Sequence, residues 1–103
     1  MKPFDLYIAY VSWDSDGKRR PVLILEEGAD SVIALNITTK YESKSEAIRD
    51  RYYTINDWKA AGLDRQSYVD TNKAVNLPIT AVDKAIGRLT AKDEIQLMEF
   101  INQ

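Results

Sequence analysis

Chemistry in this chain has to be carried by few side-chain types. Its 103 residues include neither histidine nor cysteine. That removes the usual acid–base group near neutral pH, the thiolate nucleophile and the soft ligands of transition metals. Any proton transfer must therefore use Asp, Glu, Lys, Arg or Tyr. We expect no metal site and no cofactor.

The densest group of charges is basic, because Lys18, Arg19 and Arg20 are consecutive. The net charge of the whole chain is −2, which argues against coating of nucleic acid through bulk positive charge. Binding of nucleic acid would have to be local to such a cluster. A solvated turn is the plainer interpretation of three adjacent cations, and composition alone favours it.

The elements that position these residues begin with three predicted strands. Residues 5–13 are rich in aromatic and β-branched side chains and end at the turn Asp14–Gly17, so a hairpin is expected there. Pro21 leads into a short apolar strand over Val22–Leu25, at a strand start where its missing N–H does least harm. The third strand covers Ser31–Thr38, which is nearly continuous in apolar character.

The middle of the chain predicts two short helices around one strand. Ser43 and Glu46 fit a capping box that starts a brief helix. The segment Ile48–Ile55 is interpreted as a strand with one solvent-exposed face. Asn56 is expected to cap a short helix that ends at Gly62 as the C′ residue.

The last part predicts one more strand and two helical stretches. Ser67–Thr71 is a short strand, and the pair Leu77–Pro78 interrupts the pairing that follows. A turn or short helix begins at Thr80, and Gly87 separates it from what comes next.

The C-terminus is the clearest helix. Thr90 caps it and Asp93 stands at N3. Its apolar residues recur at helical spacing, namely Ile95, Leu97, Met98 and Ile101. The elements together predict one domain over residues 1–103, mostly β in an α+β arrangement, as a small β-barrel with a C-terminal helix.

The chain shows no membrane or export signal. No apolar run approaches the roughly 20 residues that span a bilayer, and the N-terminus lacks the succession of a signal peptide. We therefore expect a cytoplasmic protein.

Five short motifs resemble the MazF/PemK family of toxins. The segment Arg20–Leu25 is similar to the family's second strand, where arginine and proline precede apolar residues. The segment Asn36–Lys40 is similar to the end of its third strand. Ala61–Leu63, Arg65–Ser67 and Ile86–Thr90 follow in the family's order. Each motif is weak alone, so the specificity lies in the ordered set, which covers about the whole chain.

The resemblance implies an SH3-like barrel of the CcdB/PemK type and a toxin endoribonuclease that cleaves single-stranded mRNA without metal. In the family the 2′-hydroxyl attacks the adjacent phosphorus and leaves a cyclic phosphate and a 5′-hydroxyl. The family's principal catalytic arginine matches Arg20, and the threonine that helps to hold the phosphate matches Thr38. A planar guanidinium can donate two parallel hydrogen bonds to phosphate oxygens that gain charge. The resemblance also implies a homodimer, growth inhibition and a cognate antitoxin.

Contacts to RNA are expected from four cations, Lys18, Arg19, Lys40 and Lys73. The chain departs from the family at two places. Residues 14–19 form a loop that is shorter than the family's and lacks its glycine-rich stretch. Val75 stands where the family has an arginine. Lys73 is expected to replace that cation, because it shares a strand face with position 75 if the segment is extended.

Several alternatives stay open at this stage. Arginine is a poor base, and the sequence does not identify the proton acceptor. Asp16, Asp70 and Tyr41 are candidates, although a structural role is the commoner one for such residues. Arg20 could form an ion pair with an acidic turn, and Thr38 could be an ordinary strand residue. A second class of function is a toxin on the same barrel that poisons a protein such as DNA gyrase, as CcdB-type relatives do. A third is a barrel without catalysis that binds nucleic acid or protein.

Overall fold

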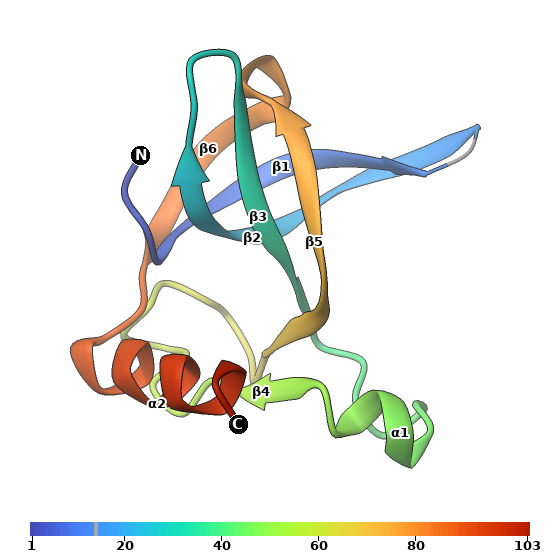
Figure 1. The fold of residues 1–103 in the computed structure, drawn as a ribbon, viewed down its shortest axis with the longest axis vertical. Coiled ribbons are helices and arrows are strands. Elements are labelled where there is room, and N and C mark those ends of the chain that lie inside the picture. The colour runs from blue at the N-terminus through green and yellow to red at the C-terminus, as the bar shows by residue number, and fades with distance from the viewer. Residues whose placement is uncertain (14) are drawn as a thin grey trace.

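A six-stranded antiparallel sheet forms the body of the protein, in the order β4-β5-β3-β2-β1-β6 (Figure 1). The computed structural model describes residues 1–13 and 15–103, except for the side chain of Trp13. The elements are β1 Asp5–Trp13, β2 Asp16–Glu27, β3 Ser31–Thr38, α1 Glu46–Arg49, β4 Tyr52–Thr54, β5 Tyr68–Pro78, the 3-10 turn η1 Ile79–Ala81, β6 Val82–Arg88 and α2 Ala91–Ile101. The predicted fold class, mostly β with a C-terminal helix, is confirmed.

The two faces of β2 and β3 belong to two different apolar clusters. Leu23 and Leu35 pack in the cluster that α2 closes with Leu97. Val22 and Ala34 pack in the second cluster. Because alternate residues of a strand point to opposite faces, a strand that is buried on both faces must be apolar at every position. The continuous apolar runs of these two strands have that origin.

The first hairpin is confirmed, and β2 is longer than predicted. The β1–β2 ladder reaches the pair Trp13 and Asp16, while the predicted turn includes residue 14, which lies outside the described residues. Pro21 does not start the strand but lies within it, opposite Ile8 of β1. It is tolerated there because the ladder with β3 begins only at Val22, so Pro21 is paired on one side alone.

The segment after β3 differs from the prediction in two ways. Helix α1 is capped by Ser45, whose hydroxyl accepts the Ile48 N–H at 3.4 Å, and not by Ser43. The helix then takes up residues 46–49, so the predicted strand Ile48–Ile55 is reduced to β4.

Residues 56–62 form successive turns instead of the predicted helix. Gly62 adopts the expected left-handed conformation, with φ of +98°. The backbone N–H groups of Asn56 and Asp57 donate to the carboxylate of Asp93, at 3.1 and 2.8 Å. A side chain of α2 therefore fixes the start of this segment, which the local sequence does not reveal.

Asp93 anchors α2 to the sheet. Thr90 caps the helix as predicted, and its hydroxyl accepts the Asp93 N–H at 3.3 Å. The Asp93 carboxylate is fully buried and also accepts the Tyr53 hydroxyl proton. Burial raises the pKa of Tyr53, and the hydrogen bond to Asp93 raises it further. The phenol therefore stays protonated and keeps its role as donor.

The last two strands also differ from the prediction. Strand β5 continues past Thr71 to Pro78, which pairs with Ser31 at the strand end. Strand β6 was not predicted, since a turn or helix was expected from Thr80. Only Val82 and Ile86 of β6 are half-buried, so this edge strand lacks a clear apolar alternation. None of the helices in the described part of the chain has the length and apolar character to cross a membrane.

Candidate active site

Strands β2 and β3 bring Arg20 and Thr38 together. The ladder between these antiparallel strands has Val22 opposite Asn36. Arg20 lies two positions before Val22, and Thr38 lies two positions after Asn36. Positions two apart share a face, so both side chains point to the same side of the sheet. They line one hollow, together with six other residues: Lys18, Asn36, Lys40, Lys44, Tyr52 and Asp70.

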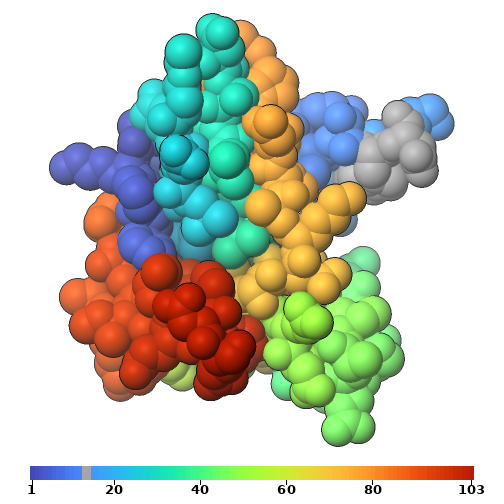
Figure 2. Space-filling view, in the orientation of Figure 1, coloured from blue at the N-terminus to red at the C-terminus, as the bar shows by residue number. Residues whose placement is uncertain are grey.

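The hollow lies where two parts of the chain stand out from the sheet. Figure 2 shows the blue β1–β2 hairpin and the green α1 segment projecting on the same side of β5, one above the other, with the surface set back between them. Lys18 comes from the hairpin, Lys40 and Lys44 precede α1, and Asp70 belongs to β5. Tyr52 of β4 completes the lining, so four separate stretches of the chain meet here: residues 18–20, 36–44, 52 and 70.

Arg20 is held without an acidic partner. In residues 1–13 and 15–103 no ion pair involves Arg20, and its Nε atom is buried without a hydrogen-bond partner. The alternative in which Arg20 forms an ion pair with an acidic turn is therefore not found in the described structure. A buried donor of this kind requires an acceptor, and a phosphate oxygen is a suitable one.

The Thr38 hydroxyl accepts one hydrogen bond and is free to donate another. Its Oγ1 accepts the N–H of Lys40 at 3.1 Å, and a hydroxyl can donate as well as accept. Within the described residues its proton meets no acceptor. Thr38 can therefore add a neutral donor beside the charged guanidinium.

The predicted RNA-binding cations do not all gather here. Lys18 and Lys40 line the hollow and an adjoining one formed with Thr39 and Ser67. Arg19 borders only the adjoining hollow, and its guanidinium forms an ion pair with Asp83 of β6.

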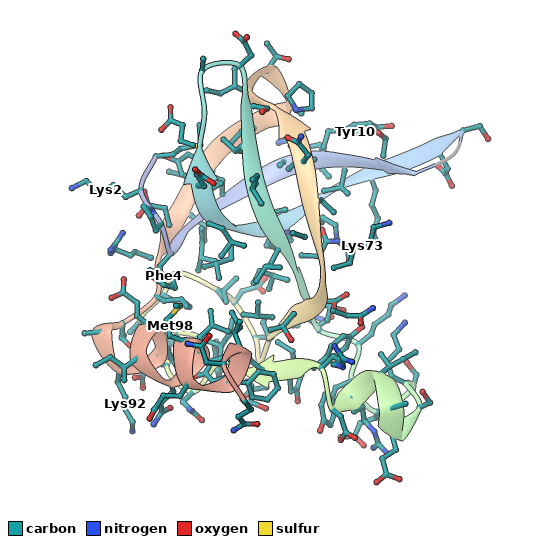
Figure 3. All side chains as sticks on the ribbon, viewed as in Figure 1. Lys2, Phe4, Tyr10, Lys73, Lys92 and Met98 are labelled. Carbon is teal, nitrogen blue, oxygen red and sulfur yellow. The ribbon has the colours of Figure 1, made fainter. Side chains whose placement is uncertain are left out.

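Lys73 lies outside the site. It lines a different hollow, with Tyr10 of β1, and both residues are labelled in Figure 3 beside β5. The β3–β5 ladder passes from the pair Leu35–Ala74 to the pair Ile37–Val69, a register shift that breaks the strand alternation. Lys73 and Val75 line the same hollow, and a contact of Lys73 with RNA stays a prediction.

Three residues of the hollow were missed as contributors by the sequence analysis, namely Asn36, Lys44 and Tyr52. Asn36 Oδ1 is buried without a partner, and the signal for it was a polar residue inside an otherwise apolar strand. Burial raises the pKa of Tyr52, Asp70 raises it further and Arg20 lowers it. The charges of Asp70 and Arg20 thus act on the same hydroxyl.

The structure separates the three candidates for the proton acceptor. Asp70 lines the hollow. Asp16 lies at the start of β2, where its carboxylate accepts the Gly17 N–H at 2.7 Å. The Tyr41 ring stacks on Tyr68 at 4.4 Å between centroids. Among the described residues, no three carboxylates gather so as to hold a metal ion.

The arrangement suits an anionic ligand that also carries a hydroxyl. Four cations line the hollow, and Asp70 is the one carboxylate among the described residues there. Cations and free donors bind phosphate oxygens, while the carboxylate and the buried Asn36 Oδ1 accept hydrogen bonds from a donor.

No protein-family model matches the sequence, and no curated protein does. Solved structures match the fold. The toxin MazF-mt6 of Mycobacterium tuberculosis aligns with a TM-score of 0.74 and 25% identity, over 95% of this chain and 92% of that one. An Mtb toxin aligns with a TM-score of 0.69 and 24% identity, over 95% and 96%. An endoribonuclease from a mycobacterial species aligns with a TM-score of 0.64 and 17% identity, over 96% and 81%.

Proposed function

We propose that this chain, which is a MazF-type toxin, cleaves single-stranded mRNA without a metal ion. The observation that carries the proposal is Arg20, whose Nε is buried without a partner beside Thr38 in a hollow lined by lysines. A toxin that only poisons a protein target has no use for such a pair of donors. The likeness in fold to MazF-mt6 and to a mycobacterial endoribonuclease supports the same function.

The mechanism follows from where charge develops. Attack of the 2′-oxygen on phosphorus increases the negative charge on the non-bridging oxygens. Arg20 donates two hydrogen bonds to them, and Thr38 donates a third. Lys18 and Lys40 hold the neighbouring phosphates of the strand. The products are a 2′,3′-cyclic phosphate and a 5′-hydroxyl.

The purified protein is expected to cut a long single-stranded RNA in excess EDTA. The same sequence in a duplex should resist, because an A-form helix keeps the 2′-oxygen out of line with its phosphate. Gel analysis of the RNA and identification of the cyclic phosphate at the new 3′ ends check both statements. Cutting that stops in EDTA and returns with magnesium would contradict the metal-independent mechanism.

We also propose a cytoplasmic homodimer that a cognate antitoxin inhibits. The outer face of α2 carries three exposed apolar side chains, Ile95, Met98 and Ile101, at 63, 44 and 41% exposure. Phe4 borders this face next to Met98 (Figure 3). Exposed apolar side chains grouped on one helix are typical of a surface that another chain covers.

The expected mass in solution is that of two chains. Light scattering at tens of micromolar protein measures it, and Ile95→Lys should shift the equilibrium toward monomer because it places a charge on the apolar face. The exposed Lys92→Gln on the same helix serves as the matched control and should stay dimeric. A wild-type protein that is monomeric throughout this range would contradict the proposal.

A further inference from the structure

We propose that Asp70 accepts the proton of the attacking 2′-hydroxyl. The inference rests on the proposed RNA cleavage and supplies the group that the sequence left open among three candidates.

The ladders place the lining residues in two rows across the sheet. In the first row, extension of the β2–β3 register by two residues places Arg20 beside Thr38, and Thr38 is paired with Tyr68. The second row lies two residues after Arg20 in β2, two before Thr38 in β3 and two after Tyr68 in β5, and a register shift between Leu35 and Ile37 leaves Asn36 without a partner in the β3–β5 ladder. Asn36 is paired with Val22 there, and Asp70 is paired with Tyr52.

These rows give the hollow two chemically different sides. The first presents donors, from the guanidinium of Arg20 and the hydroxyl of Thr38. The second presents two acceptors, the amide oxygen of Asn36 and the carboxylate of Asp70, together with the hydroxyl of Tyr52. Both Arg20 Nε and Asn36 Oδ1 are buried without partners, so each side has one unmet hydrogen bond.

A ribonucleotide matches this arrangement. Its 3′-phosphate offers acceptors and its neighbouring 2′-hydroxyl offers a donor, so a bound nucleotide can satisfy both sides together. A DNA strand lacks the hydroxyl and leaves the acceptor side unmet. The 2′-hydroxyl therefore belongs beside Asn36 and Asp70 when the phosphate contacts Arg20.

The contacts of Asp70 leave one of its carboxylate oxygens free to bind a substrate. Its Oδ1 accepts the N–H of Asn72 at 2.9 Å, and no ion pair in residues 1–13 or 15–103 includes it. The backbone hydrogen bond fixes the carboxylate, and Oδ2 is left for the substrate. Tyr52 cannot take the role, because burial raises the pKa of its hydroxyl and keeps it protonated. The lining lysines and Arg20 are cationic and accept no proton.

The step then balances. The 2′-oxygen lone pair forms the bond to phosphorus while the hydroxyl proton moves to Asp70 Oδ2. The bond from phosphorus to the 5′-oxygen breaks and its electron pair stays on that oxygen, which takes a proton from water. Asp70 later returns its proton to solvent. No oxidant, reductant or further reactant is required.

The test uses the full-length protein and a single-stranded RNA that the wild type cuts. Asp70→Asn keeps the size of the side chain and the acceptor for the Asn72 N–H, and is expected to cut at least about 10²-fold more slowly. Asp50→Asn is the matched control: Asp50 caps the end of α1, is exposed and does not line the hollow. It should cut at the wild-type rate. Melting temperatures establish that both variants are folded.

Two further measurements separate proton transfer from a structural role. An oligonucleotide with a 2′-deoxy sugar at the cleavage position should bind wild type and Asp70→Asn with dissociation constants within about threefold, because binding does not need the proton acceptor. Added formate should restore part of the cutting by Asp70→Ala, since it supplies a carboxylate in the vacated space.

The outcomes are distinct. If wild type cuts RNA and Asp70→Asn cuts as fast, the inference about Asp70 is overturned and the nuclease function stands. If Asp70→Asn loses binding of the deoxy oligonucleotide as strongly as it loses cutting, Asp70 is a binding residue and the inference is also overturned. If wild type cuts no single-stranded RNA, the proposed function fails and the inference fails with it.

Discussion

Arg20→Lys is expected to cut RNA roughly 10²- to 10³-fold more slowly than wild type, or about 3 to 4 kcal/mol in the activation barrier. The substitution keeps the positive charge, so a role in general attraction of RNA would survive it. A lysine ammonium cannot reproduce the two parallel hydrogen bonds of a guanidinium. Its nitrogen also cannot fill the buried position that Arg20 Nε occupies. Single-turnover rates with saturating protein measure the effect on the chemical step.

Thr38→Val is the companion variant. Valine has nearly the same shape and an equal preference for strands, so the fold should persist. The variant loses one neutral donor to the phosphate, for which about 1 kcal/mol is typical. A smaller penalty than for Arg20→Lys is therefore expected, and the ranking of the two rates is itself a test.

Stability distinguishes the catalytic role of Arg20 from a merely structural one. If Arg20 only made a surface ion pair, its replacement would change the free energy of unfolding by less than about 1 kcal/mol and leave the rate alone. Rates and melting temperatures measured on the same variants decide the matter. An Arg20→Lys protein that cuts RNA at the wild-type rate would remove Arg20 as the centre of the reaction.

The sequence predicts those strands well whose local pattern agrees with their place in the sheet. Strands β1 and β3 begin and end where the pattern indicated. Strand β6 was missed because an edge strand buries few side chains, and its pairing with β1 includes two register shifts. The helix expected after Asn56 fails for another reason. Asp93, distant in sequence, binds the backbone at the start of that segment, and no local pattern contains this contact.

The site was predictable in part. The motif around Arg20 and the strand end at Thr38 indicated two residues that the fold does bring to one hollow. The acceptor side was harder to predict, because Asp70 and Asn36 come to line one hollow only when β5 pairs with both β3 and β4. Lys73 lines another hollow, on the far side of the register shift in the β3–β5 ladder. Sequence spacing gives the face of a residue only where the strand is regular.

Asp93→Asn is expected to cause the largest loss of stability of any conservative change in α2. The carboxylate is fully buried and accepts hydrogen bonds from the Tyr53 hydroxyl and from the backbone N–H groups of Asn56 and Asp57. An asparagine side chain keeps one acceptor oxygen, but its amide NH2 group faces donors. At least one buried donor therefore loses its partner. Hydrogen bonds to charged groups contribute about 1.5 to 3 kcal/mol each. We therefore expect the free energy of unfolding to fall by about 3 kcal/mol.

The measurement is urea unfolding of wild type, Asp93→Asn and a control on the same helix. Glu99→Gln removes a carboxylate that is exposed on α2, and its effect should stay within about 0.5 kcal/mol. For a domain of this size each kcal/mol lowers the melting temperature by roughly 4 to 8 °C, so thermal unfolding separates the two variants clearly. Because Asp93 lies apart from the hollow that holds Arg20, the folded fraction of Asp93→Asn should still cut RNA at the wild-type rate well below its melting temperature. Equal unfolding free energies for the Asp93 and Glu99 variants would show that the buried carboxylate does not hold α2 on the sheet.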